Sequence, residues 1–153
     1  MSDQDTVNQL YTLMLQDRQA GFMQVCLTRA KALGGIIHSL SGSQLNGLAD
    51  LAKDPKQASL DSLKKEIFER YTKRWKNDGI TNQVEADVRI FQAESNKSIQ
   101  NCDLLLKQVL GGQALAQLAT AEVREAQFAR RLFQIYITAA VTFARVKQSD
   151  GRN

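Results

Sequence analysis

Apolar side chains recur every three or four positions along most of this chain, from Val7 to Val146. This spacing places them on one face of an α-helix, so amphipathic helices are the expected local structure. The helical pattern is broken only by short clusters of Gly, Ser, Asn or Asp, and proline occurs once, at Pro55. The pattern predicts an all-α protein.

The first predicted helix begins near Asp5 or Thr6. Its apolar seam alternates spacings of four and three residues, which is typical of coiled coils. The seam contains Val7, Tyr11, Met14, Gly21, Val25, Thr28 and Ala32. Gly34 and Gly35 weaken this helix, which either ends there or continues with a kink as far as Leu40. Both alternatives give one long arm.

Two further helix starts are predicted in the next segment. Ser41 and Gln44 form the Ser-x-x-Gln pattern of a capping box, which begins a short helix. Its apolar residues are Leu45, Leu48, Leu51 and Ala52. Asp54 and Pro55 suit the N-cap and the first position of another helix, which Gly79 closes in the left-handed conformation. The residues that this helix buries are Leu60, Leu63, Ile67, Tyr71 and Trp75.

From Ile80 to Val109 the chain carries an unbroken heptad seam. Its members after Ile80 are Val84, Val88, Phe91, Ser95, Ser98, Cys102, Leu105 and Val109. The middle of the seam is small and polar, so a partner helix can approach closely there. Gly111 and Gly112 then predict a turn.

The final predicted helix, residues 113–147, is apolar around most of its circumference. Its polar stripe contains Arg130, Arg131, Gln134, Thr138, Thr142 and Arg145. Such a helix is either central within its own fold or shared with a second chain. We therefore predict an antiparallel four-helix-bundle-like domain with long helices and one short extra helix. Any face left uncovered would form a homodimer interface.

Composition favours one folded domain over residues 1–153. The length allows a single core, and 43% hydrophobic with 24% charged residues is close to the globular average. Residues 1–5 and 148–153 are polar and lack an apolar period, so we expect flexible termini there.

Several features favour a cytoplasmic location. The N-terminal residues are acidic, whereas a secretory signal needs a basic start followed by an apolar stretch. The charge-free run at residues 132–144 is shorter than the roughly 20 residues that cross a bilayer, so no transmembrane segment is expected. Cys26 and Cys102 are isolated in the sequence, which suits a reducing compartment.

The sequence contains no recognisable pattern for catalysis, metal binding or cofactor binding. His38 is the only histidine and belongs to no Glu-x-x-His pair, so the ligands of a di-iron bundle site are lacking. The cysteines lack zinc-site spacing, and neither Gly-Gly pair precedes the Gly-Lys-Ser/Thr signature of a phosphate loop. We predict a protein that is not an enzyme and uses no metal or cofactor.

Charged residues interrupt two apolar faces. Arg18 lies within the seam of the first helix, and Glu122 lies within the apolar arc of the last. An unpaired buried charge is costly, so we predict that Arg18 pairs with Glu122 or with Glu94 and thereby fixes the helix register. Two alternatives remain open: a flared bundle end where all three reach water, and a functional carboxylate pair.

Positive charge is concentrated in residues 53–76, where eight basic residues exceed four acidic ones by four, the formal net charge of the whole chain. Aromatic residues interleave with them, a mixture suited to phosphate attraction and base stacking. The candidate contacts to nucleic acid or an anionic surface are Lys64, Lys65, Arg70, Lys73, Arg74 and Lys76. An ordinary amphipathic helix with its aromatic residues in the core has the same pattern, and we favour that interpretation.

Three functional classes follow from these patterns. We favour a non-enzymatic protein–protein interaction or assembly module, such as an adaptor, chaperone or structural subunit, that associates with a second copy of itself. The first alternative is a basic helical binder of nucleic acid or an anionic surface. The second alternative is a small-ligand carrier or enzyme that uses a cavity within the bundle.

Overall fold

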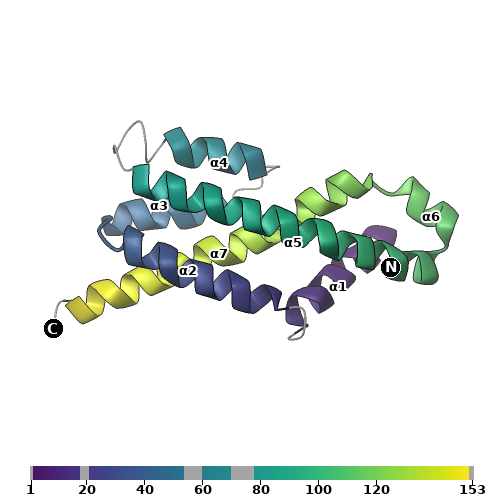
Figure 1. The fold of residues 1–153 in the computed structure, drawn as a ribbon, viewed down its shortest axis with the longest axis horizontal. Helices are drawn as coiled ribbons and strands as arrows, with labels where there is room; N and C mark the ends of the chain where they lie inside the picture. Colours follow the sequence, from purple (N-terminus) through teal and green to yellow (C-terminus); the bar gives the residue numbers. More distant parts are fainter. Residues whose placement is uncertain (1, 18–20, 54–59, 70–77, 152–153) are drawn as a thin grey trace.

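The computed structural model describes residues 2–17, 21–53, 60–69 and 78–151. These residues contain helices and no strand, which confirms the predicted all-α, bundle-like fold (Figure 1). The helices are α1 (Asp3–Gln16), α2 (Phe22–Ile37), α3 (Gly42–Lys53), α4 (Leu60–Phe68), α5 (Asp78–Leu110), α6 (Gly112–Gln117) and α7 (Ala121–Gly151).

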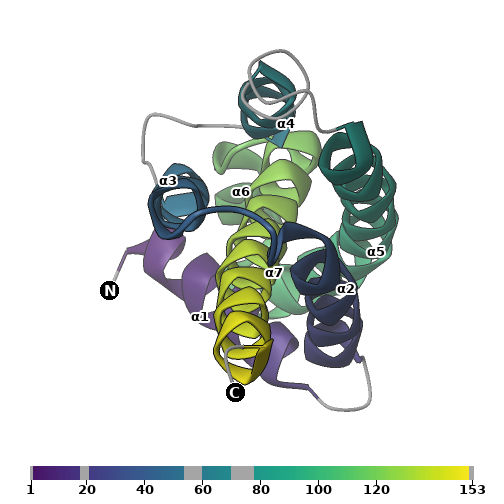
Figure 2. The same ribbon diagram turned by 90° about the vertical axis from the view of Figure 1, so that its left-hand side faces the viewer.

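Helix α7 lies at the centre of the molecule, and α2, α3, α4 and α5 all pack on it (Figure 2). This position explains why α7 is apolar around most of its circumference, because each flank meets a different neighbour. Its buried residues include Phe128, Ala129, Leu132, Phe133, Tyr136, Ile137, Ala140, Val141 and Ala144. Of the two alternatives given for the last helix, the structure shows a central position within its own fold.

Helices α2 and α7 pack closely at Gly34. A Cβ atom added to Gly34 would lie 2.8 Å from the Cβ of Phe143 and 3.0 Å from the carbonyl oxygen of Ala140. The glycine thus allows backbone-to-backbone packing, and α2 continues through Gly34 and Gly35 to Ile37. Of the two alternatives for this segment, the helix that ends at the glycines is wrong.

The chain between α1 and α2 contradicts the predicted single long arm. Helix α1 ends at Gln16, and Gly21 precedes α2 with a φ of 74°, the left-handed region that glycine adopts without strain. The break resets the helical register, so Thr28 and Ala32 of the predicted seam are exposed. The buried positions of α2 are Phe22, Cys26, Ala30, Leu33, Gly34 and Ile37.

Helix α3 begins and packs as its sequence predicts. The side-chain hydroxyl of Ser41 accepts from the Gln44 amide at 3.2 Å, and the Gln44 side chain accepts from the Ser41 amide at 2.9 Å. These two bonds form the predicted capping box. The buried residues of α3 are the predicted Leu45, Leu48, Leu51 and Ala52.

The next helix is described only in part. Ile67 of α4 is buried, as predicted. Asp54 and Pro55, where the sequence predicts the helix start, lie outside the described residues, as do Tyr71 and Trp75. Leu60 and Leu63 lie on α4.

Two predictions about the remaining glycines and helix ends need correction. Gly79 lies in the first turn of α5 with a helical backbone, and it does not take the left-handed conformation. Gly111 has a φ of 86° and forms the predicted turn, but the chain turns again at Leu118 to Thr120. The expected last helix from residue 113 is therefore two helices, α6 and α7.

Helices reach close to both termini within the described part of the chain. The Ser2 side chain caps α1, and α7 continues to Gly151. The side-chain amide of Gln148 donates to the carbonyls of His38 and Leu40, at 2.6 and 2.8 Å. These bonds tie the end of α7 to the end of α2. The flexibility expected for residues 1–5 and 148–153 stays a prediction.

Candidate functional site

The structure leaves the predicted Arg18 ion pair untested, because Arg18 lies outside the described residues. Glu122 is exposed in the first turn of α7, and Glu94 is half-buried on α5. The pairing of Arg18 with either carboxylate stays a prediction. An exposed Glu122 has less need of a partner than a buried one, because water solvates its charge.

The predicted basic surface is also mostly beyond the described segments. Lys64 and Lys65 lie on α4, and the side chain of Lys65 is exposed. The other candidate contacts, Arg70, Lys73, Arg74 and Lys76, lie outside the described residues. The basic nucleic-acid or anionic-surface site therefore stays a prediction.

A buried carboxylate that the sequence reasoning missed joins three helices. Asp87 of α5 is fully buried and accepts a hydrogen bond from the Tyr136 hydroxyl of α7. The amide of Gln83 donates to the same carboxylate at 3.0 Å, and the Arg29 Nε atom of α2 lies 3.7 Å from its other oxygen. Burial and then the bond to Asp87 raise the pKa of Tyr136, so its hydroxyl stays a donor. The cluster aligns α2, α5 and α7.

The signal for this cluster was present in the sequence. Asp87 lies three residues after Val84 and four before Phe91, so helical periodicity places it on the apolar seam. An acidic residue at such a position needs a buried partner. No local rule identifies Tyr136 as that partner, because the two residues are 49 positions apart.

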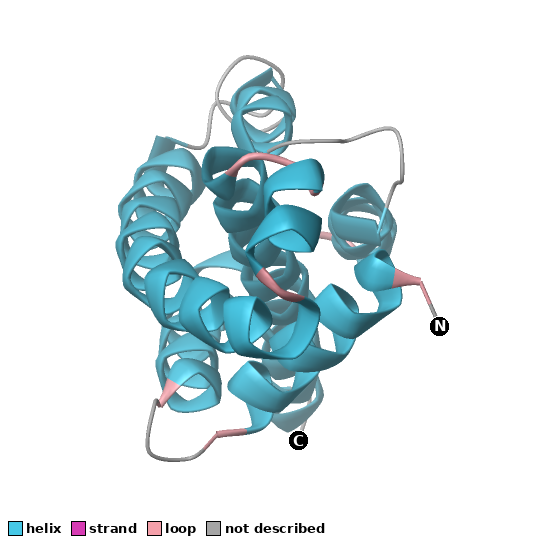
Figure 3. Ribbon diagram, turned by 90° about the vertical axis from the view of Figure 1, so that its right-hand side faces the viewer, coloured by secondary structure: helices cyan, strands magenta, loops and turns pink. Residues whose placement is uncertain are grey.

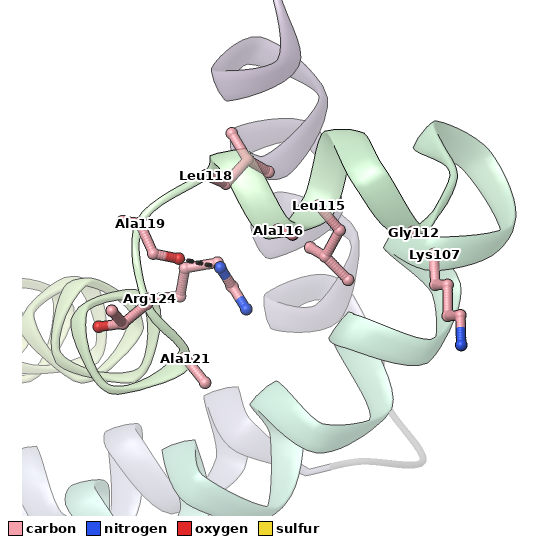
Figure 4. A pocket seen from close by; sticks show the side chains of 9 residues that line it. Lys107, Gly112, Leu115, Ala116, Leu118, Ala119, Ala121 and Arg124 are labelled. Carbon is pink, nitrogen blue, oxygen red and sulfur yellow. Dashed lines mark hydrogen bonds between the residues drawn. The ribbon is translucent and has the colours of Figure 1, made fainter.

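A second polar cluster ties α1 and α5 to the start of α7. Arg124 is only 6% exposed and makes a bidentate pair with Asp103, with N–O distances of 3.1 and 2.8 Å. It also donates to the carbonyl of Ala119, as Figure 4 shows. The Tyr11 hydroxyl donates to the Arg124 carbonyl at 3.1 Å, and burial is the main cause that raises the Tyr11 pKa. Every polar group named here has a structural partner.

An open hollow of about 440 Å³ lies beside this cluster, at the corner between α5, α6 and α7 (Figure 4). Figure 3 views the molecule from this end. The residues that line the hollow are Lys107, Gly112, Leu115, Ala116, Leu118, Ala119, Thr120, Ala121 and Arg124. Helix α6 has no buried residue, so this corner is covered less completely than the rest of the bundle.

The last two residues of the predicted heptad seam of α5 are exposed at the same corner. The prediction is confirmed from Val84 to Cys102, where every seam residue is buried. It is wrong for Leu105 and Val109, which are 48% and 63% exposed, and the neighbouring Leu104 is 65% exposed. We call Leu104, Leu105 and Val109 the apolar tip. These three side chains are exposed, whereas Leu106 between them is fully buried, so the covered face of α5 passes through Leu106 and leaves the predicted seam positions uncovered.

The histidine and the two cysteines belong to no metal-binding group within the described residues. No group of three His, Cys, Asp or Glu side chains there could hold a metal ion. Burial raises the pKa of the Cys26 thiol to about 12, and burial followed by the Asp103 charge raises that of Cys102 to about 11. Neither thiol is a ready nucleophile at neutral pH, since the thiolate is the reactive form.

We expect both cysteines to react slowly with iodoacetamide at neutral pH in the folded protein and quickly in denaturant. The raised pKa also makes stability depend on pH. The pKa of the Cys26 thiol rises from the ordinary 9.0 to about 12 on folding. The thiol therefore ionises first in the unfolded state, and stability falls as pH rises through that interval. Mass spectrometry of the labelled protein and urea unfolding across this pH range measure the two effects. Rapid labelling of both folded thiols would contradict the burial.

Comparison of the chain with protein-family models, curated proteins and solved structures finds no match. None of the helices in the described residues combines the length and apolar character that crossing a bilayer requires.

Proposed function

We propose that this protein is a non-enzymatic helical assembly module that associates with a second copy of itself through the apolar tip. The observation that carries the proposal is the seam of α5, which is buried up to Cys102 and then exposes Leu105 and Val109 on the same periodic face. Clustered exposed apolar side chains mark interaction sites more often than single ones do. The proposal locates the protein in the cytoplasm, where its free thiols remain reduced.

A second copy suits this surface for two reasons. A heptad seam is self-complementary, because its apolar side chains pack between those of an equivalent helix. Exposed charges of both signs lie on the two helices that line the corner, with Lys107 on α5 and Glu122 on α7. A two-fold axis brings each patch against its own copy, so Lys107 of one chain can face an acidic residue of the other.

The buried polar groups beside the tip support a structural role over a catalytic one. Arg124 is held by Asp103 and by the carbonyl of Ala119, and the Tyr11 hydroxyl is committed to the Arg124 carbonyl. These contacts hold the corner in place. In the proposal the corner is the rigid platform on which the second copy packs.

Size-exclusion chromatography with light scattering tests this proposal through a matched pair of variants. Val109 and Val146 are both exposed valines, at 63% and 53%, and α7 carries Val146 close to its C-terminal end, away from α6 (Figure 1). Val109→Glu should weaken the dimer by about 100-fold or more, because burial of one valine side chain, worth about 1.5 kcal/mol, is lost in each of two copies. Val146→Glu should leave the dimer unchanged.

The alternatives give different results in the same experiment. A wild-type monomer over the whole concentration range, or equal effects of the two substitutions, would overturn the proposal. A monomer that carries nucleic acid, seen in the absorbance ratio and released by salt, would favour the basic binder. Circular dichroism of each variant checks that the helices are intact.

A further inference from the structure

A polar pocket of about 350 Å³ lies between α1 and α7. Its lining residues are Gln4, Asn8, Tyr11, Gln127, Arg130, Arg131 and Gln134. The volume is near the lower end of the range for small-molecule sites, which begins at about 300 Å³. Two guanidinium groups and four side-chain amides in one small pocket form an unusually polar lining.

Arg131 is held in this pocket by the aromatic ring of Tyr11. Its guanidinium carbon lies 5.5 Å from the ring centroid, and its Nη1 atom donates to the Asn8 carbonyl at 3.4 Å. Two contacts restrict the Tyr11 ring. Its hydroxyl donates to the Arg124 carbonyl, and its centroid lies 5.5 Å from the centroid of the Phe128 ring. A guanidinium fixed at one edge keeps its other N–H donors available in a set direction.

The charged side chains that line the pocket, Arg130 and Arg131, are both positive. Among the described residues, no carboxylate lines it, and Arg131 forms no ion pair with any of them. The Gln4 amide donates to the Asn8 side-chain oxygen at 3.4 Å, which leaves the Asn8 amide nitrogen as a donor. Arginine beside neutral amide donors is the donor set that binds carboxylate or phosphate oxygens.

We propose that this pocket binds the oxyanion of a small molecule, either a carboxylate or a phosphate. Arg131 supplies the fixed charged donor, Arg130 adds a second positive charge, and Gln127 and Gln134 supply neutral hydrogen bonds. The proposed site does not use the apolar tip, because none of its lining residues belongs to the tip.

Titration of the full chain with inorganic phosphate and, separately, with succinate tests the site. Amide NMR spectra should change saturably at Asn8, Tyr11 and Gln134, and the anion that binds should raise the melting temperature. The more tightly bound anion identifies the ligand class. Arg131→Gln should weaken binding by about tenfold or more, the loss expected for a charge-assisted hydrogen bond.

Two further variants keep the test decisive. Arg89→Gln removes the same charge from an exposed position on α5, so it should bind as the wild type does. Gln127→Ala changes an exposed side chain of the pocket and should weaken binding by about threefold, even if Arg131→Gln does not fold. Changes that rise linearly without saturation, or equal affinities of all three variants and the wild type, would overturn the site.

Discussion

Asp87→Ala is expected to lower the free energy of unfolding by about 3 kcal/mol, at the lower end of the range for breaking a buried ionic contact. The substitution removes the acceptor of the Tyr136 hydroxyl, which is fully buried and has no access to water. Arg29 moderates the loss because its side chain is 42% exposed and can be solvated. Urea unfolding followed by circular dichroism measures the change.

The contribution of the Asp87 cluster can be separated by a double-mutant cycle. Tyr136→Phe removes only the hydroxyl, and Asp87 then keeps Gln83 and Arg29 as partners. Asp87→Ala combined with Tyr136→Phe should cost less than the sum of the two, because the second change removes the group that the first leaves unsatisfied. Asp50→Ala, at an exposed position on α3, controls for the helix propensity of alanine. Additive effects would contradict the buried hydrogen bond.

Gly34→Ala is expected to destabilise the protein by about 1–3 kcal/mol, the usual cost of overpacking a core. The added methyl group would meet the Phe143 Cβ atom at 2.8 Å and the Ala140 carbonyl oxygen at 3.0 Å. Neither atom is the end of a flexible side chain, so α2 and α7 must move apart. This loss should exceed the helix-propensity gain of about 1 kcal/mol that alanine brings.

The adjacent glycine supplies the matched control for this prediction. A Cβ atom at Gly35 would have no neighbour within 4 Å, so Gly35→Ala should stabilise the protein by about 0.5–1 kcal/mol. Opposite signs of the two changes in urea unfolding would establish that Gly34 is a packing contact. A stabilising effect at both positions would show that the helices are farther apart than described.

Much of the secondary structure follows from local patterns in the sequence. The capping box of Ser41 and Gln44 and the burial of Leu45, Leu48 and Leu51 are both properties of neighbouring residues. Helical periodicity and capping act over about four residues, so they can be read without knowledge of the fold. The same holds for α7, whose apolar circumference predicted a helix with neighbours on several sides.

Local patterns were weaker at the ends and turns of helices. The seam across Gly21 continues the heptad spacing, yet the glycine takes a left-handed conformation and the chain breaks there. The pattern from Leu105 to Val109 also continues the heptad, but no helix of the described segments covers those residues. Periodicity states which face of a helix is apolar, whereas the presence of a neighbouring helix depends on the path of the whole chain.

The buried polar clusters and the close helix contact come from the tertiary structure alone. Tyr11 meets Arg124 across 113 positions, and Asp87 meets Tyr136 across 49. A sequence can indicate that a buried polar group needs a hydrogen-bond partner, but it does not identify which residue is that partner. Gly34 likewise has the appearance of a helix breaker in the sequence, and the packing of α7 against it makes it a contact point. Local periodicity thus determines the helices, and long-range packing decides which of their residues meet and which remain available to other molecules.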